Sequence, residues 1–392
     1  MKHIVVVVTN DLMTDQRVDR TCRALTEAGY RVTLIGRRLP ASVPLAARPY
    51  RTERMRLLFR RSALFYAEYN IRLLLRLMTM KADAYYANDS DTLPACAVAA
   101  KLRRKPLLFD AHELFPDVPE LEGRTRVQAV WRWVEKRWLP RVTAAFTVCK
   151  SVADEYRRRY GIEMKVVRNM PEAVSHQQSS TNSMKSDVGQ LVNLSPEYPI
   201  LLYQGAVNVG RGVREMLDAM EWLPDCRLVI AGDGDERTAM EQYADSLPWK
   251  ERVVFTGRLE PATLKTLTRQ ASLGLCLLED RGLNYRYSLP NRIGDFAQAG
   301  VPLLATDFPE IAAVLQEYGI GQLVPPCPQE KGDGNYQQYV RDLSRQIADT
   351  LDCWKTMPKE ERERRFARAG EELCWEREKK VLIEAVDAIF CP

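Results

Sequence analysis

The sequence has few histidines, scattered cysteines and no long apolar run, and each shortage excludes a class of protein. Three His and nine Cys, with no Cys-x-x-Cys pair, cannot build a zinc framework. An odd, dispersed set of thiols is typical of a reducing compartment rather than a disulfide-linked secreted fold. No apolar run approaches the roughly 18–20 residues that span a bilayer. The opening residues MKHIVVVVTND predict a strand rather than a signal peptide, because the apolar run is short. We therefore expect a cytoplasmic protein.

The charge is unevenly distributed along the chain. The 392 residues carry a net charge of +5, with 46% hydrophobic and 28% charged residues, which is an ordinary globular composition for two domains. Residues 1–170 hold 32 Lys and Arg against 18 Asp and Glu, a balance of +14, and the remaining 25 basic and 34 acidic residues give −9. A basic first half predicts an anionic partner. No nucleic-acid-binding motif is present, so a membrane surface or a phosphate-bearing ligand fits better than nucleic acid.

Apolar runs alternate with amphipathic helical segments in both halves, which predicts an α/β fold with parallel, doubly wound sheets. The predicted domains are residues 1–171, a Ser-, Gln- and Asn-rich connection or insertion at 172–197, residues 198–370, and a C-terminal helix at 371–392 that crosses back to the first domain. Ligands bind at the carboxyl ends of such strands, so two facing domains predict a central cleft. The predicted strands are residues 4–8, 31–36, 84–88, 106–110, 144–148, 165–169, 199–205, 226–234, 252–257, 273–278, 301–306 and 321–325.

Residues 284–310, NYRYSLPNRIGDFAQAGVPLLATDFPE, place a polar loop at the start of a helix. The loop holds Ser288, Asn291 and Arg292, and Asp295 lies in the first turns of a helix that ends at Gly300. The free N–H groups of a helix start suit a phosphate. Arg292 adds a positive charge, and Asp295 adds an acceptor for sugar hydroxyls. The alternatives are a surface arginine and a carboxylate that only caps the helix.

A glycine-rich loop follows a predicted strand in YQGAVNVGRGVREMLDAM, residues 203–220. Its glycines, Gly205, Gly210 and Gly212, permit a close backbone turn. With Asn208, Arg211 and the loop amides they predict a diphosphate site, whereas the alternative is an ordinary strand–helix loop.

These segments, and nearly the whole chain, resemble the retaining glycosyltransferases of GT-B fold that use nucleotide sugars, the bacterial group 1 and family 4-like enzymes. The family motif has two glutamates separated by seven residues. Asp295 with AQAGVPLLATD (297–307) matches its second half, Tyr287 stands at the first acidic position, and Arg211–Gly212 matches the basic–Gly pair. The resemblance implies two Rossmann-like domains and sugar transfer from a UDP- or GDP-sugar to a hydroxyl of a glycan or lipid-linked acceptor. It also implies a role in cell-surface glycan or polysaccharide biosynthesis, with no metal or other cofactor.

The resemblance also carries over to other loops. It places His112, in FDAHELFPD with Glu113, near the transferred sugar, and sets Gly232, Gly257 and Arg258 around the nucleotide. For His112 the alternative is a packed loop histidine satisfied by a neighbouring carboxylate.

Three further residues form the predicted acceptor side together with Glu113. Asp15 could cap the next helix, and Arg17 could hold a phosphate. Asp89, in NDSD with Asp91, either lines the cleft or contributes to a magnesium site.

Residues 51–78 contain seven Arg and two Glu among long apolar side chains. They predict either a helix on an anionic membrane, at the inner face of the plasma membrane, or a core-facing helix with a solvated basic face. The same two interpretations apply to residues 130–138. The expected membrane contacts are Arg54, Arg56, Arg60 and Arg61.

Two other functions remain open from the sequence. One is a nucleotide-sugar epimerase of the same fold, which needs acid and base carboxylates near the sugar. The other is a non-catalytic binding or scaffolding protein, an interpretation that Tyr287 favours.

Overall fold

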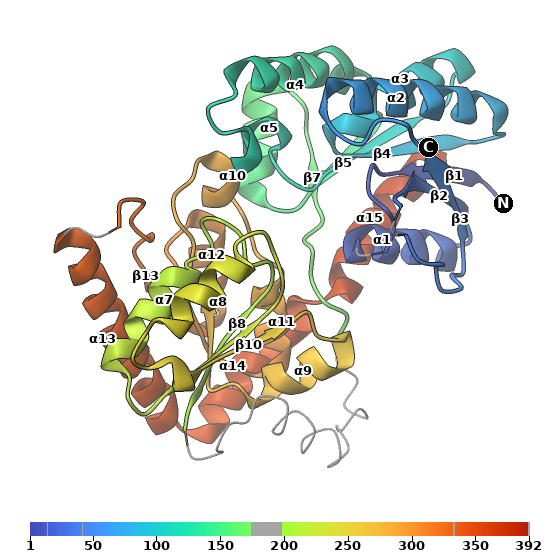
Figure 1. Cartoon of the computed structure of the whole chain (residues 1–392). Helices are drawn as coiled ribbons and strands as arrows, with labels where there is room; N and C mark the ends of the chain where they lie inside the picture. The colour runs from blue at the N-terminus through green and yellow to red at the C-terminus, as the bar shows by residue number, and fades with distance from the viewer. Residues whose placement is uncertain (14, 41, 174–197, 332–333, 391–392) are drawn as a thin grey trace. The chain divides into compact units, whose positions relative to one another are not determined.

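The computed structural model describes residues 1–13, 15–40, 42–173, 198–331 and 334–390 (Figure 1). The chain divides into an N-terminal unit, Met1–Asn169 with Arg377–Pro392, and a C-terminal unit, Met170–Glu376. Each unit is built on one all-parallel sheet, as the alternation of apolar runs and helices predicts. The predicted connection at 172–197 lies, from residue 174 onward, outside the described residues.

The sheet of the N-terminal unit has the order β3-β2-β1-β4-β5-β6-β7. β1, β4 and β5 are fully buried, because helices cover both faces of the sheet. The order reverses between β1 and β4, which pair in parallel with Val6 opposite Tyr86. The strands are β1 His3–Val7, β2 Arg31–Arg38, β3 Arg51–Arg56, β4 Ala84–Asn88, β5 Leu107–Ala111, β6 Ala144–Thr147 and β7 Lys165–Val166.

Two helical layers cover this sheet (Figure 1). On one face α2 (Ser62–Thr79) and α4 (Thr125–Trp138) both pack on α3 (Asp89–Arg103), and they meet at the rings of Tyr66 and Trp131, whose centroids are 4.8 Å apart. The unit also contains α1 (Gln16–Glu27), α5 (Lys150–Tyr160) and α15 (Trp375–Phe390).

The end of the chain is anchored in the N-terminal unit by α15. Arg168 Nε donates to Glu378 Oε1 at 2.7 Å, and the Tyr30 hydroxyl donates to Asp387. These bonds join residues far apart in sequence, so residues 377–390 complete the N-terminal unit.

The sheet of the C-terminal unit has the order β10-β9-β8-β11-β12-β13 and reverses between β8 and β11. Hydrophobic clusters lie on its two faces, one around Phe296 and Leu303 and the other around Tyr203 and Leu304. The strands are β8 Ile200–Gln204, β9 Arg227–Ala231, β10 Val253–Gly257, β11 Leu273–Cys276, β12 Leu303–Thr306 and β13 Gly321–Val324. The helices are α7 Val213–Ala219, α8 Arg237–Asp245, α9 Pro261–Gln270, α10 Leu283–Arg286, α11 Arg292–Ala299, α12 Pro309–Tyr318, α13 Gly334–Thr356 and α14 Lys359–Glu372.

The prediction of one helix over residues 51–78 is wrong. Residues 51–56 form β3, which pairs with β2, and α2 begins at Ser62, whose φ is +70°. β3 is an edge strand whose side chains are half-buried or exposed, so it lacks the apolar alternation that identifies the inner strands.

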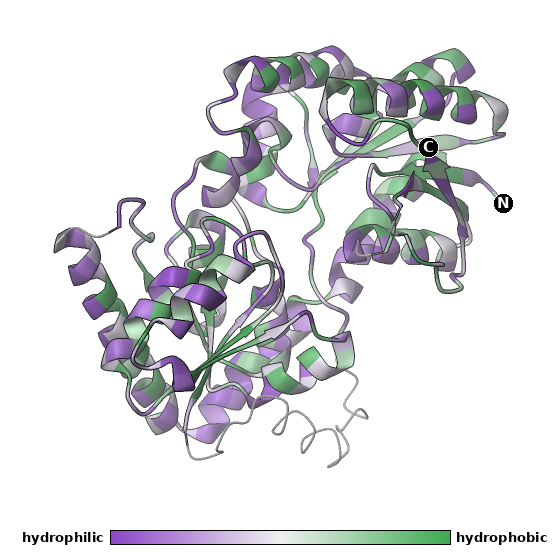
Figure 2. Ribbon diagram, viewed as in Figure 1, coloured by the Kyte–Doolittle hydropathy of each residue, from purple (hydrophilic) through white to green (hydrophobic). Residues whose placement is uncertain are grey.

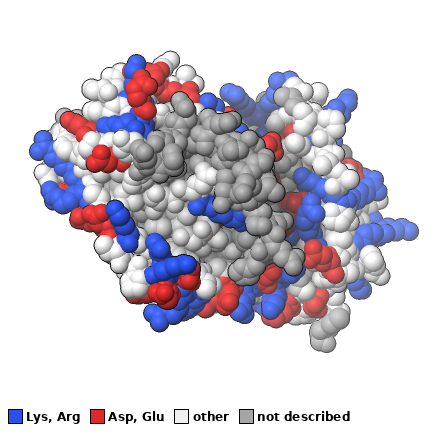
Figure 3. All heavy atoms as spheres, turned by 90° about the horizontal axis from the view of Figure 1, so that it is seen from below, with Lys and Arg blue, Asp and Glu red and all other residues white. Residues whose placement is uncertain are grey.

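The surface reflects the excess of basic residues in the first half. In the face drawn in Figure 3, Lys and Arg predominate toward the right-hand edge, on the side where Figure 1 draws β1 to β3. None of the helices in the described part of the chain combines the length and the apolarity that a bilayer-spanning helix needs.

Candidate active site

In each unit the strand order reverses at one point, between β1 and β4 and between β8 and β11. Loops leave such neighbouring strands toward opposite faces of the sheet, which opens a crevice at their carboxyl ends where ligands bind. Most of the predicted site residues lie in the loops at these two ends.

Arg292 is the central cation of the C-terminal unit. It begins α11, its side chain is buried, and its guanidinium lies 4.4 Å above the ring of Tyr203. A Cβ added to Gly205 would be 3.2 Å from Arg292 Nη2, so the guanidinium lies directly against the end of β8. Its Nη1 is buried without a hydrogen-bond partner, and no carboxylate in the described part of the chain forms an ion pair with it. A buried cation at a helix N-terminus is unfavourable in itself, so this position fits an anion.

Arg211 presents a second unpaired guanidinium from the glycine-rich loop. Its guanidinium carbon lies 4.7 Å above the ring of Tyr285, and its Nε is buried without a partner. Gly212 has a φ of +67°, and a Cβ there would be 2.5 Å from Leu277 Cβ, so the loop is pressed onto the end of β11.

The two arginines share one neighbourhood. Burial raises the pKa of the Cys276 thiol, and Arg292 and Arg211 both oppose this shift, which places both charges near the end of β11. Two guanidinium groups with unpaired N–H groups beside one strand end are suited to a diphosphate.

Asp295 is held in a fixed orientation. Gln204 Nε2 donates to Asp295 Oδ2 at 3.0 Å, and Thr268 Oγ1 donates to Gln204 Oε1 at 2.8 Å, which sets the orientation of the buried amide. Three side chains that contact the predicted residues were not identified from the sequence: Gln204, Tyr203 and Tyr285. A polar Gln204 at the end of the apolar run 200–203 was the one available signal.

The other predicted donor residues are placed as follows. A Cβ on Gly232 would be 1.7 Å from Gly205 O, so only glycine fits there. Gly257 has a φ of +66°, which disfavours residues with a side chain, and a Cβ there would be 2.7 Å from Arg237 Nη1. Gly210 also has a positive φ, of +79°.

Four other predicted residues lie at the surface or make only single contacts. Asn208 Oδ1 accepts from Asp235 N at 3.2 Å and so joins two loops, and Ser288 Oγ donates to Tyr285 O at 2.8 Å. Asn291 precedes α11 without a side-chain cap, and Asn291 and Arg258 are both exposed.

In the N-terminal unit His112 follows β5 and lies between two carboxylates. Its Nδ1 is 3.5 Å from Asp89 Oδ2, its Nε2 is 3.6 Å from Asp110 Oδ2, and its backbone N donates to Asp89 Oδ1 at 2.9 Å. Burial by itself lowers the pKa of His112, but the two carboxylates outweigh it and raise the pKa to about 9. At neutral pH His112 is therefore a cation and a hydrogen-bond donor rather than a general base.

Asp89 and Asp91 follow β4 in the same cluster. Desolvation is the main reason that the pKa of each rises to about 7, and the charge of Glu113 adds to it. Asp89 has a φ of +58°, a strained conformation that directs its carboxylate to His112. Thr9 Oγ1 donates to Asp91 Oδ2 at 2.6 Å. Within the described ranges, no group of three or more His, Cys, Asp and Glu is arranged to hold a metal ion.

The prediction of a phosphate contact for Arg17 is wrong. Its side chain is 3% exposed, and its Nε and Nη2 donate to the two oxygens of Asp110 at 3.1 and 2.7 Å, while Nη1 donates to Val167 O at 2.6 Å. Burial favours the neutral acid, but Arg17 and His112 hold the pKa of Asp110 far below its usual range. Arg17 therefore fixes Asp110, which in turn holds His112.

Asp15 caps the start of α1, as one of the two interpretations of the sequence predicts, and its acceptor-side role stays a prediction. Its Oδ1 accepts from Val18 N at 3.0 Å, which makes it the N-cap, and its Oδ2 accepts from Asn10 Nδ2 at 2.6 Å.

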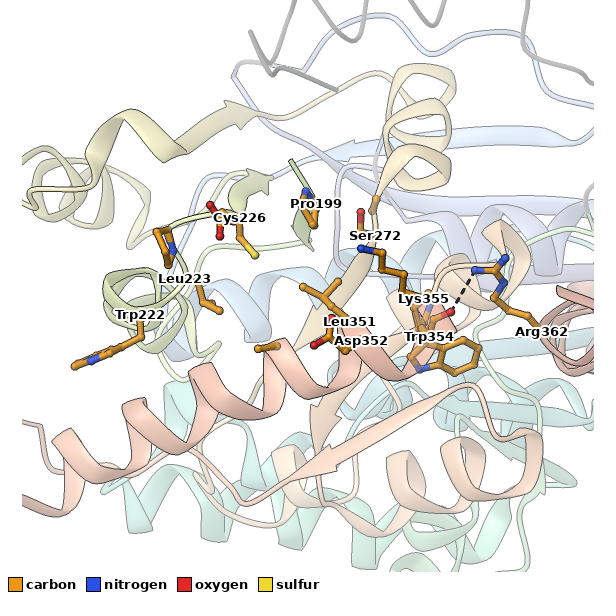
Figure 4. A pocket seen from close by; sticks show the side chains of 16 residues that line it. Pro199, Trp222, Leu223, Cys226, Ser272, Leu351, Asp352, Trp354, Lys355 and Arg362 are labelled. Atoms are coloured by element: carbon orange, nitrogen blue, oxygen red, sulfur yellow. Dashed lines mark hydrogen bonds between the residues drawn. The ribbon is translucent and has the colours of Figure 1, made fainter. Parts of the chain in front are cut away.

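A cavity of about 610 Å³ lies at the opposite edge of the C-terminal sheet (Figure 4). Pro199, Cys226, Ser272 and Pro302, which line it, directly precede β8, β9, β11 and β12. It is therefore at the amino ends of the strands, and no predicted site residue lines it.

Both halves of the chain match known glycosyltransferase families. The sequence model of Glycosyltransferase Family 4 matches residues 15–177, and that of Glycosyl transferases group 1 matches residues 198–334. Together they cover most of the chain. The chain belongs to the GT-B glycosyltransferases.

Solved structures and a curated relative agree with this assignment. A sucrose-phosphate synthase from Thermosynechococcus elongatus is 17% identical with a TM-score of 0.76, and the match covers 100% of this chain and 99% of that one. HepE from Anabaena, solved with UDP-glucose, is 14% identical with a TM-score of 0.71 and coverages of 99% and 100%. Alpha-D-kanosaminyltransferase of Streptomyces kanamyceticus is 23% identical over 211 residues, and the match spans half of this GT-B chain and half the length of that relative. The predicted GT-B fold and the predicted glycosyltransferase family are confirmed, whereas retention of configuration stays a prediction.

Proposed function

We propose that this GT-B protein transfers a hexose from a UDP- or GDP-linked donor to an acceptor hydroxyl in glycan or polysaccharide biosynthesis, with retention of configuration and without a metal ion. The observation that carries the proposal is the pair of stacked guanidinium groups of Arg211 and Arg292, each of which has one buried N–H group without a hydrogen-bond partner. When the bond to the sugar breaks, negative charge grows on the diphosphate. Cations that are already oriented stabilise this charge without reorganisation.

The remaining polar residues have roles that follow from their contacts. Asp295, oriented by Gln204, accepts from the ribose hydroxyls. Cationic His112 donates a hydrogen bond that orients the transferred sugar, since it is held by Asp89 and Asp110 and is already protonated at neutral pH. UDP-glucose bound to the similar HepE is the precedent for this class of donor.

Calorimetry with UDP and GDP, with and without EDTA, tests the donor site. We expect the nucleotide affinity to be the same with and without EDTA. A loss of affinity in EDTA would indicate a metal site, with Asp89 and Asp91 as candidate ligands. Donor hydrolysis and transfer are then measured on the same protein. Binding without either activity would favour a non-catalytic protein, in line with Tyr287 at the first acidic position of the family motif.

We also propose a peripheral contact with anionic membranes through one face of the N-terminal unit. On α2 the exposed Leu64, Ile71 and Leu75 recur at helical spacing, and α4, which contacts the same layer, exposes Val130 and Trp133. Figure 2 shows hydrophobic and hydrophilic turns mixed on both helices. Exposed cations on or next to these helices include Arg61, Arg126, Lys136 and Arg137. Such a mixture suits an anionic lipid surface.

The predicted contact of Arg54 with the membrane is wrong. Arg54 Nη1 pairs with Asp11 Oδ1 at 2.9 Å, and the Arg54 side chain is largely buried.

Vesicle co-sedimentation tests the membrane face with the double variant Ile71→Ser, Trp133→Ser. The variant should lose binding to vesicles that contain phosphatidylglycerol, and salt should weaken the binding of the wild type. Leu102→Ser is the matched control, because Leu102 is equally exposed at the end of α3. Equal binding of wild type and double variant would rule out this face.

A further inference from the structure

A pocket rich in arginine lies at the carboxyl ends of β2 and β3, away from the residues discussed so far. Its volume is about 290 Å³. Half of its lining is arginine, and no lining residue is acidic: Arg37, Arg38, Leu39, Pro40, Arg56, Leu57, Phe59 and Arg60. The space exceeds the roughly 30 Å³ of a water molecule several times, so a phosphate or diphosphate group fits.

The arginines of this pocket differ from their neighbours in having no acidic partner. Nearby Arg54 pairs with Asp11 and Arg76 with Glu53. In contrast, no ion pair within the described residues involves Arg37, Arg38, Arg56 or Arg60, and Arg37 Nε is buried without a hydrogen-bond partner. Like charges gathered around one cavity repel each other, and a bound anion would remove this repulsion.

The pocket is held in shape by its surroundings. The guanidinium of Arg37 lies 4.8 Å above the ring of Phe65, which fixes its direction. The carboxylate of Glu68 on α2 accepts from the backbone N of Leu58 and of Phe59 at 2.9 and 2.8 Å, so the loop that supplies Phe59 and Arg60 is tied to α2. A preorganised set of guanidinium groups binds phosphate oxygens in pairs and with strong directionality.

The pocket lies at the same sheet edge as His112. β2 and β3 are on one side of β1, β4 and β5 are on the other, and all five strands are parallel. Phe65, on which Arg37 stacks, contacts Tyr69, whose hydroxyl donates to Val8 O at the end of β1. A continuous set of contacts therefore joins the arginine pocket to the end of β1.

We propose that this arginine pocket binds a phosphate or diphosphate group carried by the acceptor. Anion binding follows from the pocket alone, whereas its assignment to an acceptor rests on the proposed function. Arg56 and Arg60, for which the sequence predicted a membrane contact, line this pocket, and in this proposal they contact the phosphate.

The first experiment is calorimetry with inorganic pyrophosphate in an Arg292→Met background, which removes competition from the donor site. The double variant Arg56→Gln, Arg60→Gln should weaken pyrophosphate binding at least tenfold. Arg31→Gln, Arg51→Gln is the matched control, because these exposed arginines lie at the other ends of the same two strands. Unchanged binding in the pocket variant, or an equal loss in the control, would overturn the proposal.

A second measurement separates this proposal from the proposed function. With Arg292 intact, the pocket variant should bind UDP as the wild type does. If the wild type fails to bind UDP or GDP, the donor assignment falls, while the pyrophosphate result still decides the pocket.

Vesicles identify the source of the phosphate. Wild type is compared on phosphatidic acid and phosphatidylglycerol at equal surface charge. A preference for phosphatidic acid that disappears in the pocket variant assigns the phosphate to a lipid. Pyrophosphate binding without this preference assigns it to a soluble acceptor, and the absence of both would refute the proposal.

Discussion

Replacing Arg292 by Met should weaken nucleotide binding without lowering the stability of the fold. Arg292 is 7% exposed, begins α11 and leaves Nη1 unpaired, so the unligated protein holds a buried cation with no counter-charge. Methionine retains much of the apolar volume without the charge. We therefore expect the variant to fold at least as stably as the wild type while losing nucleotide affinity.

The magnitudes follow from the contacts. Stacking of a cation on Tyr203 contributes up to about 2 kcal/mol, and this is lost. Removing the unpaired charge avoids a desolvation penalty of several kcal/mol, and removing a cation from a helix N-terminus recovers about 0.3–1 kcal/mol. The net gain is on the order of 1 kcal/mol, or about 2–4 °C in Tm for a unit of this size. The lost charge-assisted contact should weaken UDP binding by about 1.5–3 kcal/mol, roughly 10- to 150-fold.

Thermal denaturation with and without UDP measures both effects together. Arg214→Met is the control, because Arg214 also stacks on a tyrosine, Tyr243, but lies 3.8 Å from the carboxylate of Asp218. The control should keep the UDP-induced rise in Tm. An Arg292→Met protein that is several kcal/mol less stable and binds UDP normally would show that Arg292 is a structural residue and refute the phosphate assignment.

Three other variants test the pKa shifts and the backbone packing. The pKa of Asp91 rises to about 7, so stability falls as pH rises from about 4 to 7. Asp91→Asn should remove this fall. In urea unfolding, the free energy of unfolding of the variant minus that of the wild type should be larger at pH 8 than at pH 4, by an amount on the order of 4 kcal/mol. A difference that is the same at both pH values would contradict the pKa shift. His112, with a pKa raised to about 9, contributes stability fully below its unfolded pKa of 6.5. This contribution disappears as pH rises through about 9, and kcat/KM should decline over the same range; a flat profile to pH 10 would exclude a cationic role. Gly232→Ala should lower both Tm and UDP affinity, because its Cβ would be 1.7 Å from Gly205 O. Gly370→Ala lies within α14, and its Cβ would be 3.8 Å from its nearest neighbour, so it should leave UDP affinity unchanged and should not lower Tm. An equal loss in both variants would contradict the close contact at Gly232.

Local patterns in the sequence predicted the fold and several of the candidate site residues. Inner strands of a doubly wound sheet are buried on both faces, so they stand out as short apolar runs, and five of the six predicted for the first half overlap strands of at least four residues. Gly300 ends α11 in a left-handed conformation, as a glycine after an amphipathic segment predicts. Arg211, Arg292 and Asp295 could be predicted as site residues because polar residues at strand ends and helix starts have few structural uses.

Only the tertiary structure shows which residues far apart in the sequence contact each other. Arg17 and Asp110 are 93 positions apart and Gln204 and Asp295 are 91 apart, so no local pattern reveals that Arg17 is internally satisfied or that Gln204 orients Asp295. The arginine pocket depends on the pairing of β2 with β3, which brings Arg38 opposite Arg56. Burial, charge pairing and unpaired N–H groups are properties of neighbours in space, and strand register rather than chain order sets those neighbours.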